Sequence, residues 1–131
     1  MPTYEHASRS TPVALLSQAR GSLVEAEAAV DAGDRFRLAH LSALRTGAAV
    51  CAYRGRPSAA RRRLMSVWVL VERVAPEHAH WAAYFAAGAQ IRAAIEAGAV
   101  SAVSVRAADD QVRAASEFLA VVEESLGLLA A

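Results

Sequence analysis

The stretch that decides the fold is Val-Trp-Val-Leu-Val-Glu-Arg-Val-Ala-Pro-Glu-His-Ala-His-Trp-Ala-Ala-Tyr-Phe, which occupies residues 67–85. Its apolar residues recur at helical spacing on both sides of Pro76. A proline is tolerated in the first turn of a helix but disrupts a helix interior. One helix should therefore end near Val74 and the next should begin at Pro76. The stretch predicts two consecutive helices that carry both tryptophans of the chain.

Capping residues and helical periodicity divide the rest of the chain in the same manner. Thr11-Pro12 is typical of a helix start, Gly33-Asp34 of a stop followed by a new start, and Ser104 of a cap. The expected helices span about 11–32, 35–53, 58–74, 76–97 and 105 to the end of the chain, with loops at 54–58 and 99–103. We predict an all-α, five-helix bundle without a sheet. Residues 1–10 are expected to form a flexible segment, and residues 11–131 a single helical-bundle domain.

Apolar residues at helical spacing mark the side of each helix that should face the core. From the first helix to the last, they are Leu16, Ala19, Leu23, Ala26 and Val30; Phe36, Ala43, Leu44, Gly47 and Val50; Leu64, Val67, Trp68, Leu70 and Val71; Trp81, Tyr84, Phe85, Ala87, Ile91 and Ile95; and Ala108, Val112, Ala115, Leu119, Val122 and Leu126. We interpret the clustered aromatic residues as core or dimer contacts. They are not interleaved with basic residues, as base-stacking groups would be.

Composition narrows the function classes. All 14 basic residues are arginine, and 13 acidic residues balance them to a net charge of +1, so no overall field attracts nucleic acid or a lipid surface. Cys51 is the only cysteine and cannot form an internal disulfide. No apolar run approaches the ~20 residues that span a bilayer, and the N-terminus lacks the apolar core of a signal peptide. We therefore expect a cytoplasmic protein without membrane association.

Three blocks resemble the HEPN superfamily, and more narrowly its small, stand-alone actinobacterial branch. They are Asp-Arg-Phe-Arg-Leu-Ala-His-Leu-Ser-Ala-Leu-Arg-Thr-Gly-Ala-Ala-Val (34–50), Ser-Val-Trp-Val-Leu-Val-Glu-Arg-Val-Ala-Pro-Glu-His-Ala-His-Trp-Ala-Ala-Tyr-Phe-Ala-Ala-Gly (66–88) and Ala-Asp-Asp-Gln-Val-Arg-Ala-Ala-Ser-Glu-Phe-Leu-Ala-Val-Val-Glu (108–123). The resemblance covers most of the chain from about Leu15 to Leu126 and implies a helical bundle that dimerises. Many members are RNases that use an arginine followed after four to six residues by a histidine, whereas others are binding or interaction modules.

Two arginine–histidine pairs satisfy that spacing. Arg35 and His40 lie five positions apart in one predicted helix, which turns them about 140° away from each other. Arg73 lies before Pro76, while His78 and His80 follow it, so the bend offers a way for them to meet. We therefore favour Arg73 with His78 or His80 as the catalytic candidates. A polar residue, often asparagine, usually follows the arginine in the RNase branches, whereas Val74 follows it here, which favours a non-catalytic interpretation.

Simpler interpretations of the same residues compete with catalysis. Arg73 suits the negative end of a helix dipole, and an acidic residue such as Glu77 suits the first turn of the next helix. His78 and His80 are two positions apart and point to nearly opposite sides of a helix, which disfavours a zinc pair. We predict no metal site and no cofactor.

An arginine cluster is harder to explain as structure. Arg61, Arg62 and Arg63 occupy the early turns of a predicted helix, where positive charge opposes the helix dipole. Nucleic-acid phosphate or an acidic protein surface would offset that cost, and so would internal ion pairs at a solvated rim.

These observations favour a dimeric interaction module, or a module that binds nucleotides or nucleic acid, with no catalytic activity. The alternative is a metal-independent RNase of toxin or defence type, in which a histidine moves the 2′-OH proton and an arginine neutralises the phosphate.

If the arginine cluster binds an acidic polymer, replacing Arg61, Arg62 and Arg63 by glutamine should weaken RNA binding and reduce its salt dependence without loss of helical content. Fluorescence anisotropy with a labelled RNA at several salt concentrations measures both quantities. Unchanged binding at low salt would place the cluster at a solvated rim.

Overall fold

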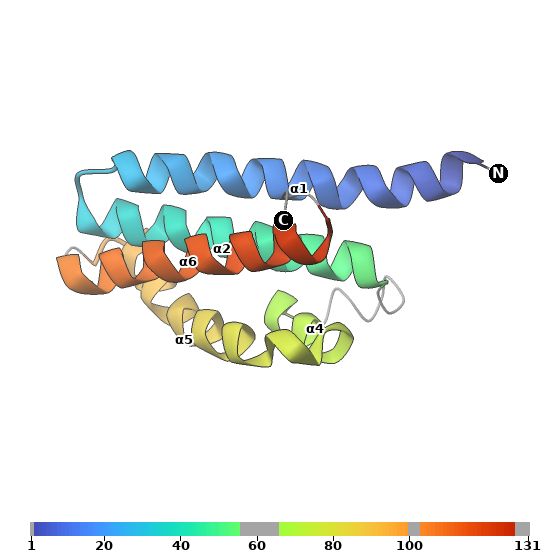
Figure 1. The fold of residues 1–131 in the computed structure, drawn as a ribbon. Coiled ribbons are helices and arrows are strands. Elements are labelled where there is room, and N and C mark those ends of the chain that lie inside the picture. The colour runs from blue at the N-terminus through green and yellow to red at the C-terminus, as the bar shows by residue number, and fades with distance from the viewer. Residues whose placement is uncertain (1, 56–65, 100–102, 128–131) are drawn as a thin grey trace.

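The computed structural model describes residues 2–55, 66–99 and 103–127, and only the backbone of residues 2–10. Figure 1 shows its helices, which are α1 (Pro2–Ala28), α2 (Ala32–Arg54), α4 (Val67–Val74), the short 3-10 helix η1 (Pro76–His78), α5 (Ala79–Glu96) and α6 (Val105–Ser125). The described part of the chain contains no strand. The predicted all-α bundle of five helices is confirmed. None of the helices in these described ranges is long and apolar enough to cross a membrane.

Helix α2 is the centre of the bundle. It packs against α1 and α6 on one side and against α4 and α5 on the other, so it contacts each of the other α-helices in the described part of the chain. Figure 1 shows α1, α2 and α6 running side by side, with α4 and α5 forming a layer on the side of α2 away from α1. The layer of α4 and α5 therefore has one surface on the core and one facing outward.

Aromatic rings fill the space between α4, α5 and α6. Phe85 of α5 is completely buried, and its ring centroid lies 5.3 Å from that of Trp68 and 5.6 Å from that of Phe118. Trp81 completes the cluster, 5.6 Å from Phe118. These contacts place one tryptophan from each side of Pro76 in a single cluster, which is how the two helices of the 67–85 stretch join the core.

The first helix differs from its predicted bounds. It was expected to begin at Thr11-Pro12 and reach about residue 32, but α1 begins at Pro2, includes Pro12 and ends at Ala28. Val30 therefore falls outside the helix and is 93% exposed, so its predicted place in the core is wrong. Asp31 accepts a hydrogen bond from the Asp34 backbone N–H at 3.0 Å and caps α2, three residues before the predicted cap. Flexibility of residues 1–10 stays a prediction, because helical geometry does not measure motion.

Helix α5 buries Phe85 as predicted and packs Trp81 against the core, but two of its predicted core residues, Tyr84 and Ala87, face outward. Its buried residues are Ala82, Phe85 and Gly88, whereas Tyr84 is 43% exposed and Ala87 is also exposed. The reason is steric, because alanine and glycine let α5 approach α2 closely. A Cβ atom at Gly88 would lie 3.3 Å from the Cδ2 of His40. Periodicity favours large side chains inward, but close packing selects the small ones here.

Serine caps start two of the helices. Ser104 accepts a hydrogen bond from the Ala107 backbone N–H at 3.0 Å, as predicted, and Ser66 accepts one from the Val69 N–H at 3.3 Å. The cap at Ser66 shows that α4 begins at Val67, so a helix expected from residue 58 does not continue unbroken to Val74. Residues 58–65 of that prediction, with Leu64, lie outside the described residues.

Candidate functional site

The three catalytic candidates lie in different surroundings. Arg73 is exposed in the last turn of α4. His78, in η1, is 5% exposed and its ring meets the edge of Phe118 with centroids 5.7 Å apart. His80 is exposed in the first turn of α5, with its ring centroid 4.9 Å from that of Trp81. No hydrogen bond or ion pair joins any two of these residues. One histidine faces the core, and the other two candidates face solvent.

Arg54 takes the place at the end of α4 that the sequence suggested for Arg73. The Arg54 guanidinium reaches from the end of α2, donates to the Val74 carbonyl at 3.3 Å and forms an ion pair with Glu77. The hydrogen bond from Arg54 lowers the pKa of the Glu77 carboxyl below its ordinary value. Glu77 is therefore engaged with Arg54 and is a poor general base for either histidine. Sequence reasoning missed this contact because Arg54 and Glu77 are 23 positions apart.

Arg35 and His40, the other arginine–histidine pair, lie in different places: His40 in the core and Arg35 where α1, α2 and α6 meet. His40 is 1% exposed, and its Nε2–H donates to the Phe85 carbonyl at 2.8 Å. Because a carbonyl only accepts, the proton is on Nε2, and Nδ1 is free to accept from Arg92 at 3.4 Å. Burial lowers the pKa of His40 from its ordinary value, so the ring is held neutral. Both ring nitrogens are thus occupied by core contacts.

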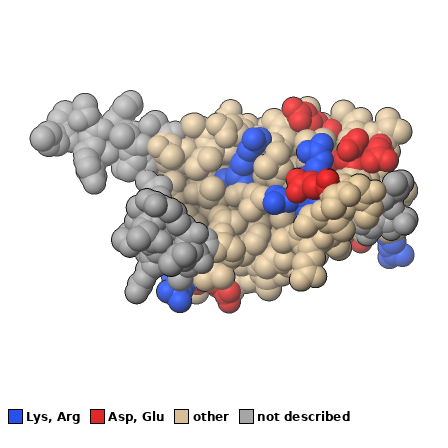
Figure 2. Space-filling model, turned by 180° about the vertical axis from the view of Figure 1, so that it is seen from behind, with Lys and Arg blue, Asp and Glu red and all other residues tan. Residues whose placement is uncertain are grey.

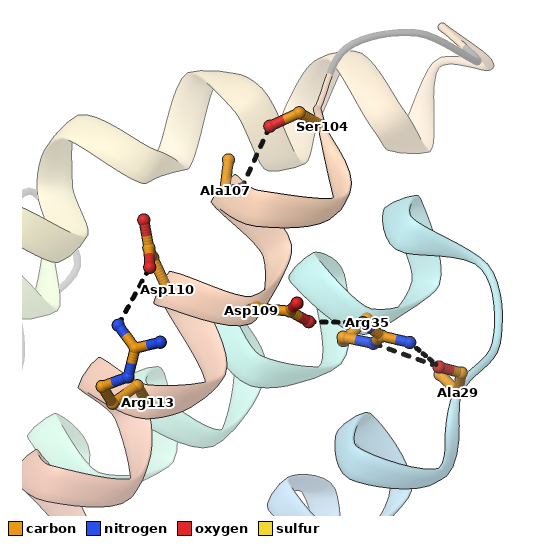
Figure 3. Close-up of polar contacts among 7 residues, drawn as sticks. All are labelled: Ala29, Arg35, Ser104, Ala107, Asp109, Asp110 and Arg113. Carbon is orange, nitrogen blue, oxygen red and sulfur yellow. Dashed lines mark hydrogen bonds and ion pairs between the residues drawn. The ribbon is translucent and has the colours of Figure 1, made fainter.

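Arg35 holds three helices together instead of facing His40. Its guanidinium donates to the Ala29 carbonyl, with distances of 3.0 and 3.2 Å, and forms an ion pair with Asp109 of α6. Figure 3 shows Arg35 between the end of α1 and α6, with Asp109 pointing toward it and Asp110 pointing away. The sequence prediction that Arg35 and His40 do not converge agrees with this geometry.

A shallow groove runs along α5 and α6 beside His80. It has a volume of about 460 Å³ and is lined by His80, Trp81, Tyr84, Asp110, Arg113, Ala114 and Glu117. Arg113 donates to Asp110 at 2.9 Å, so the two charges are already paired along α6. Burial, followed by the nearby Asp110 carboxylate, raises the pKa of the Tyr84 phenol. The groove offers aromatic surface with two carboxylates and one guanidinium, and so lacks the concentrated positive charge that would hold an RNA backbone.

Arg61, Arg62 and Arg63 lie outside the described residues. Across the described residues, no group of three or more histidine, cysteine, aspartate or glutamate side chains is placed to hold a metal ion.

Comparison with known families decides the identity of the bundle. The model of the SAV_6107-like HEPN family matches residues 26–123, which run from the end of α1 almost to the end of α6. The chain belongs to this HEPN family. The superfamily resemblance seen in the sequence is therefore confirmed, and the helical architecture agrees with it. No curated protein and no solved structure matches the chain.

The buried histidines should make the stability of this HEPN domain depend on pH. Burial lowers the pKa of His40 and of His78, so the unfolded chain binds protons more readily than the folded one near pH 6.5. The contribution of these two neutral histidines to the free energy of unfolding is fully present above about pH 6.5 and decreases as the pH falls below that value. Urea unfolding at pH 7.5 and at pH 5.0 should show a lower free energy of unfolding at the acidic pH.

Replacing His78 by phenylalanine removes one of the two titrating groups while keeping a ring against Phe118. The difference in unfolding free energy between the two pH values should shrink in this variant. A wild-type protein with a higher free energy of unfolding at pH 5.0 than at pH 7.5 would contradict this prediction.

Proposed function

We propose that this HEPN domain is a non-catalytic interaction module that forms a homodimer through the outer surface of α5. The observation that carries the proposal is the lack of charged residues in α5 before Arg92. From His78 to Ile91 the sequence contains no arginine, lysine, aspartate or glutamate. A helix on the surface of a monomer normally carries charged residues on its outward side.

Between the exposed polar residues His80 and Gln90, the outward side of α5 carries mostly small apolar residues. Ala83, Tyr84, Ala86 and Ala87 are all exposed, although α5 already buries a separate set of residues against α2. Val69 of α4 adds a side chain that is 41% exposed in the neighbouring helix. Figure 2 shares its vertical direction with Figure 1 and shows uncharged surface over much of the lower part, where α4 and α5 lie. Uncharged surface that includes exposed apolar side chains is typical of an interaction site.

A second copy of the chain suits this surface. In a dimer with two-fold symmetry the same patch meets itself, so the patch must be complementary to its own chemistry. The uncharged part of α5 meets that condition, and the α6 edge beside it carries both signs of charge in Asp110, Arg113 and Glu117. HEPN domains often dimerise, which supports a second copy over an unrelated partner.

The arrangement of the candidate residues supports a role without catalysis. RNA cleavage by an arginine and a histidine requires the histidine that moves the proton and the arginine that neutralises charge to reach one phosphate. His78 packs on Phe118, Arg73 and His80 are exposed, and Glu77 is occupied by Arg54. His40 uses both ring nitrogens inside the core.

Charges placed on the outer surface of α5 should separate the dimer. We expect light scattering after size exclusion at micromolar concentration to give twice the chain mass for the wild type. Replacing Ala83 and Ala86 by glutamate should give the monomer mass with unchanged helical content, because buried unpaired carboxylates oppose association.

A matched control is Ala14→Glu, which makes the same change at an exposed alanine of α1, across the bundle from α5. This variant should remain dimeric. A wild-type monomer, or a dimer that survives both α5 substitutions, would overturn the proposed interface.

The proposal also predicts that purified protein cleaves RNA no faster than a variant carrying Arg73→Ala, His78→Ala and His80→Ala. Gel analysis of a labelled RNA without added metal measures the difference. Cleavage by the wild type that disappears in the triple variant would establish the RNase alternative. Helical content of the triple variant is the folding control, because His78 is buried against Phe118 and its loss affects packing.

A further inference from the structure

A second cavity lies between the middle of α5 and the first turns of α6. It has a volume of about 260 Å³, and its lining comes from three helices. The lining residues are Phe36 of α2; Tyr84, Ala87, Gly88 and Ile91 of α5; and Ala107, Asp110 and Gln111 of α6. Two aromatic rings and small apolar side chains make most of this lining, with one carboxylate and one amide. Small-molecule sites typically combine apolar walls with a few polar groups in this way.

Gln111 is the residue that bundle packing does not explain. Its side chain is 3% exposed, and its Nε2 is buried without a hydrogen-bond acceptor. Leaving an amide donor unpaired in the interior is costly, and native proteins pair the great majority of such groups. Leucine would fill nearly the same volume without that cost. An unpaired amide beside a cavity therefore indicates a ligand that supplies the missing acceptor.

Gly88 forms the part of the cavity wall nearest this amide. A Cβ atom added at Gly88 would lie 3.4 Å from the Phe36 ring and 3.5 Å from the Gln111 Nε2. Any side chain at this position would therefore occupy the space between the ring and the amide. The glycine keeps α5 close to α2 and keeps open the approach to the Gln111 amide at the same time.

The charges around the cavity restrict the ligand further. No lining residue is basic, so nothing in the lining would neutralise a phosphate or a carboxylate. Asp110 contributes a carboxylate, of which Oδ1 accepts from Arg113 and Oδ2 is available for a second donor. A ligand should therefore bring a carbonyl oxygen for the Gln111 amide and an N–H for Asp110, joined to a flat ring that packs between Phe36 and Tyr84.

We propose that this cavity binds an uncharged ring that carries a carboxamide or a cyclic amide. The amide carbonyl accepts from Gln111 Nε2, the amide N–H donates to Asp110, and the ring occupies the apolar space beside Gly88. This site adjoins the proposed dimer surface, because Tyr84 and Ala87 contribute to both, whereas Ala83 and Ala86 do not line the cavity.

Three probes of similar size test the ligand class, namely benzamide, benzoate and toluene. Benzamide has both the acceptor and the donor, benzoate lacks the donor and carries a negative charge, and toluene has only the ring. Titrating each into ¹⁵N-labelled protein and following amide chemical shifts measures binding. Benzamide should shift the side-chain amide signals of Gln111 and the backbone signals of Gly88 and Ala107 with a Kd of about 1 mM, which is typical of a ligand this small. Benzoate and toluene should bind at least about tenfold more weakly.

Two substitutions separate this site from a purely structural role of Gln111. Gln111→Leu should weaken benzamide binding about tenfold, while its midpoint of urea unfolding rises because a buried unpaired donor is gone. Gln90→Leu makes the same change at an exposed position of α5 and should leave benzamide binding unaltered. Gly88→Ala should also weaken binding, because the added methyl group enters the space beside Phe36.

The proposal is overturned if benzamide shifts none of these signals, if benzoate binds as tightly as benzamide, or if Gln111→Leu retains full binding. A lower unfolding midpoint for Gln111→Leu would likewise overturn it, because the amide would then be holding the fold. Since the dimer is measured by mass and this site by local chemical shifts, failure of one proposal is distinguishable from failure of the other.

Discussion

The close approach of α5 to α2 at Gly88 is the constraint on which most of this structure depends. With no side chain at that position, the two helices come near enough for the His40 Nε2–H to reach the Phe85 carbonyl at 2.8 Å. The same approach fixes the rotation of α5, which turns Phe85 into the aromatic cluster and leaves Tyr84 outward. The proposed dimer surface and the cavity beside Gln111 both follow from this one rotation. Helix α4 also approaches α2 closely at a glycine, since a Cβ atom at Gly47 of α2 would lie 3.1 Å from the Trp68 ring of α4.

Arginine has a mainly architectural role in the described part of the bundle. Arg20 pairs with Glu123 between α1 and α6, Arg35 with Asp109 between α2 and α6, and Arg54 with Glu77 between α2 and η1. Ion pairs that are partly exposed add little stability individually, on the order of 1 kcal/mol or less, but they fix the register of one helix against another. Neighbouring carboxylates neutralise the positive charge of these arginines. This internal pairing fits a net charge near zero and explains why abundant arginine does not by itself indicate RNA binding.

Internal contacts also engage two of the histidines that could take part in catalysis. A catalytic histidine needs a free ring nitrogen and a nearby cation that faces the substrate. His40 has neither ring nitrogen free, and His78 presents its ring to Phe118. His40, His78 and Glu77 are each held in a separate contact, which is the physical basis for proposing an interaction role.

The sequence by itself determined the helical class, the break at Pro76, the serine cap at Ser104 and the superfamily, because these depend on local backbone preferences and on residue patterns. It also predicted that Arg35 and His40 would not converge, since their angular separation follows from helix geometry alone. The start of α1 was predicted wrongly, because a proline inside a helix is disfavoured locally yet is accommodated in α1.

Only the tertiary structure decided which side of α5 faces inward, that Arg54 binds Glu77, and that Gln111 is buried beside a cavity. Each of these features joins residues far apart in the chain or depends on how closely two helices approach. Hydrophobic periodicity predicts buried positions from the polarity and spacing of side chains. The space between packed helices then limits how large a side chain each position can hold. That difference is why a glycine and an alanine, and not the neighbouring tyrosine, occupy the inner side of α5.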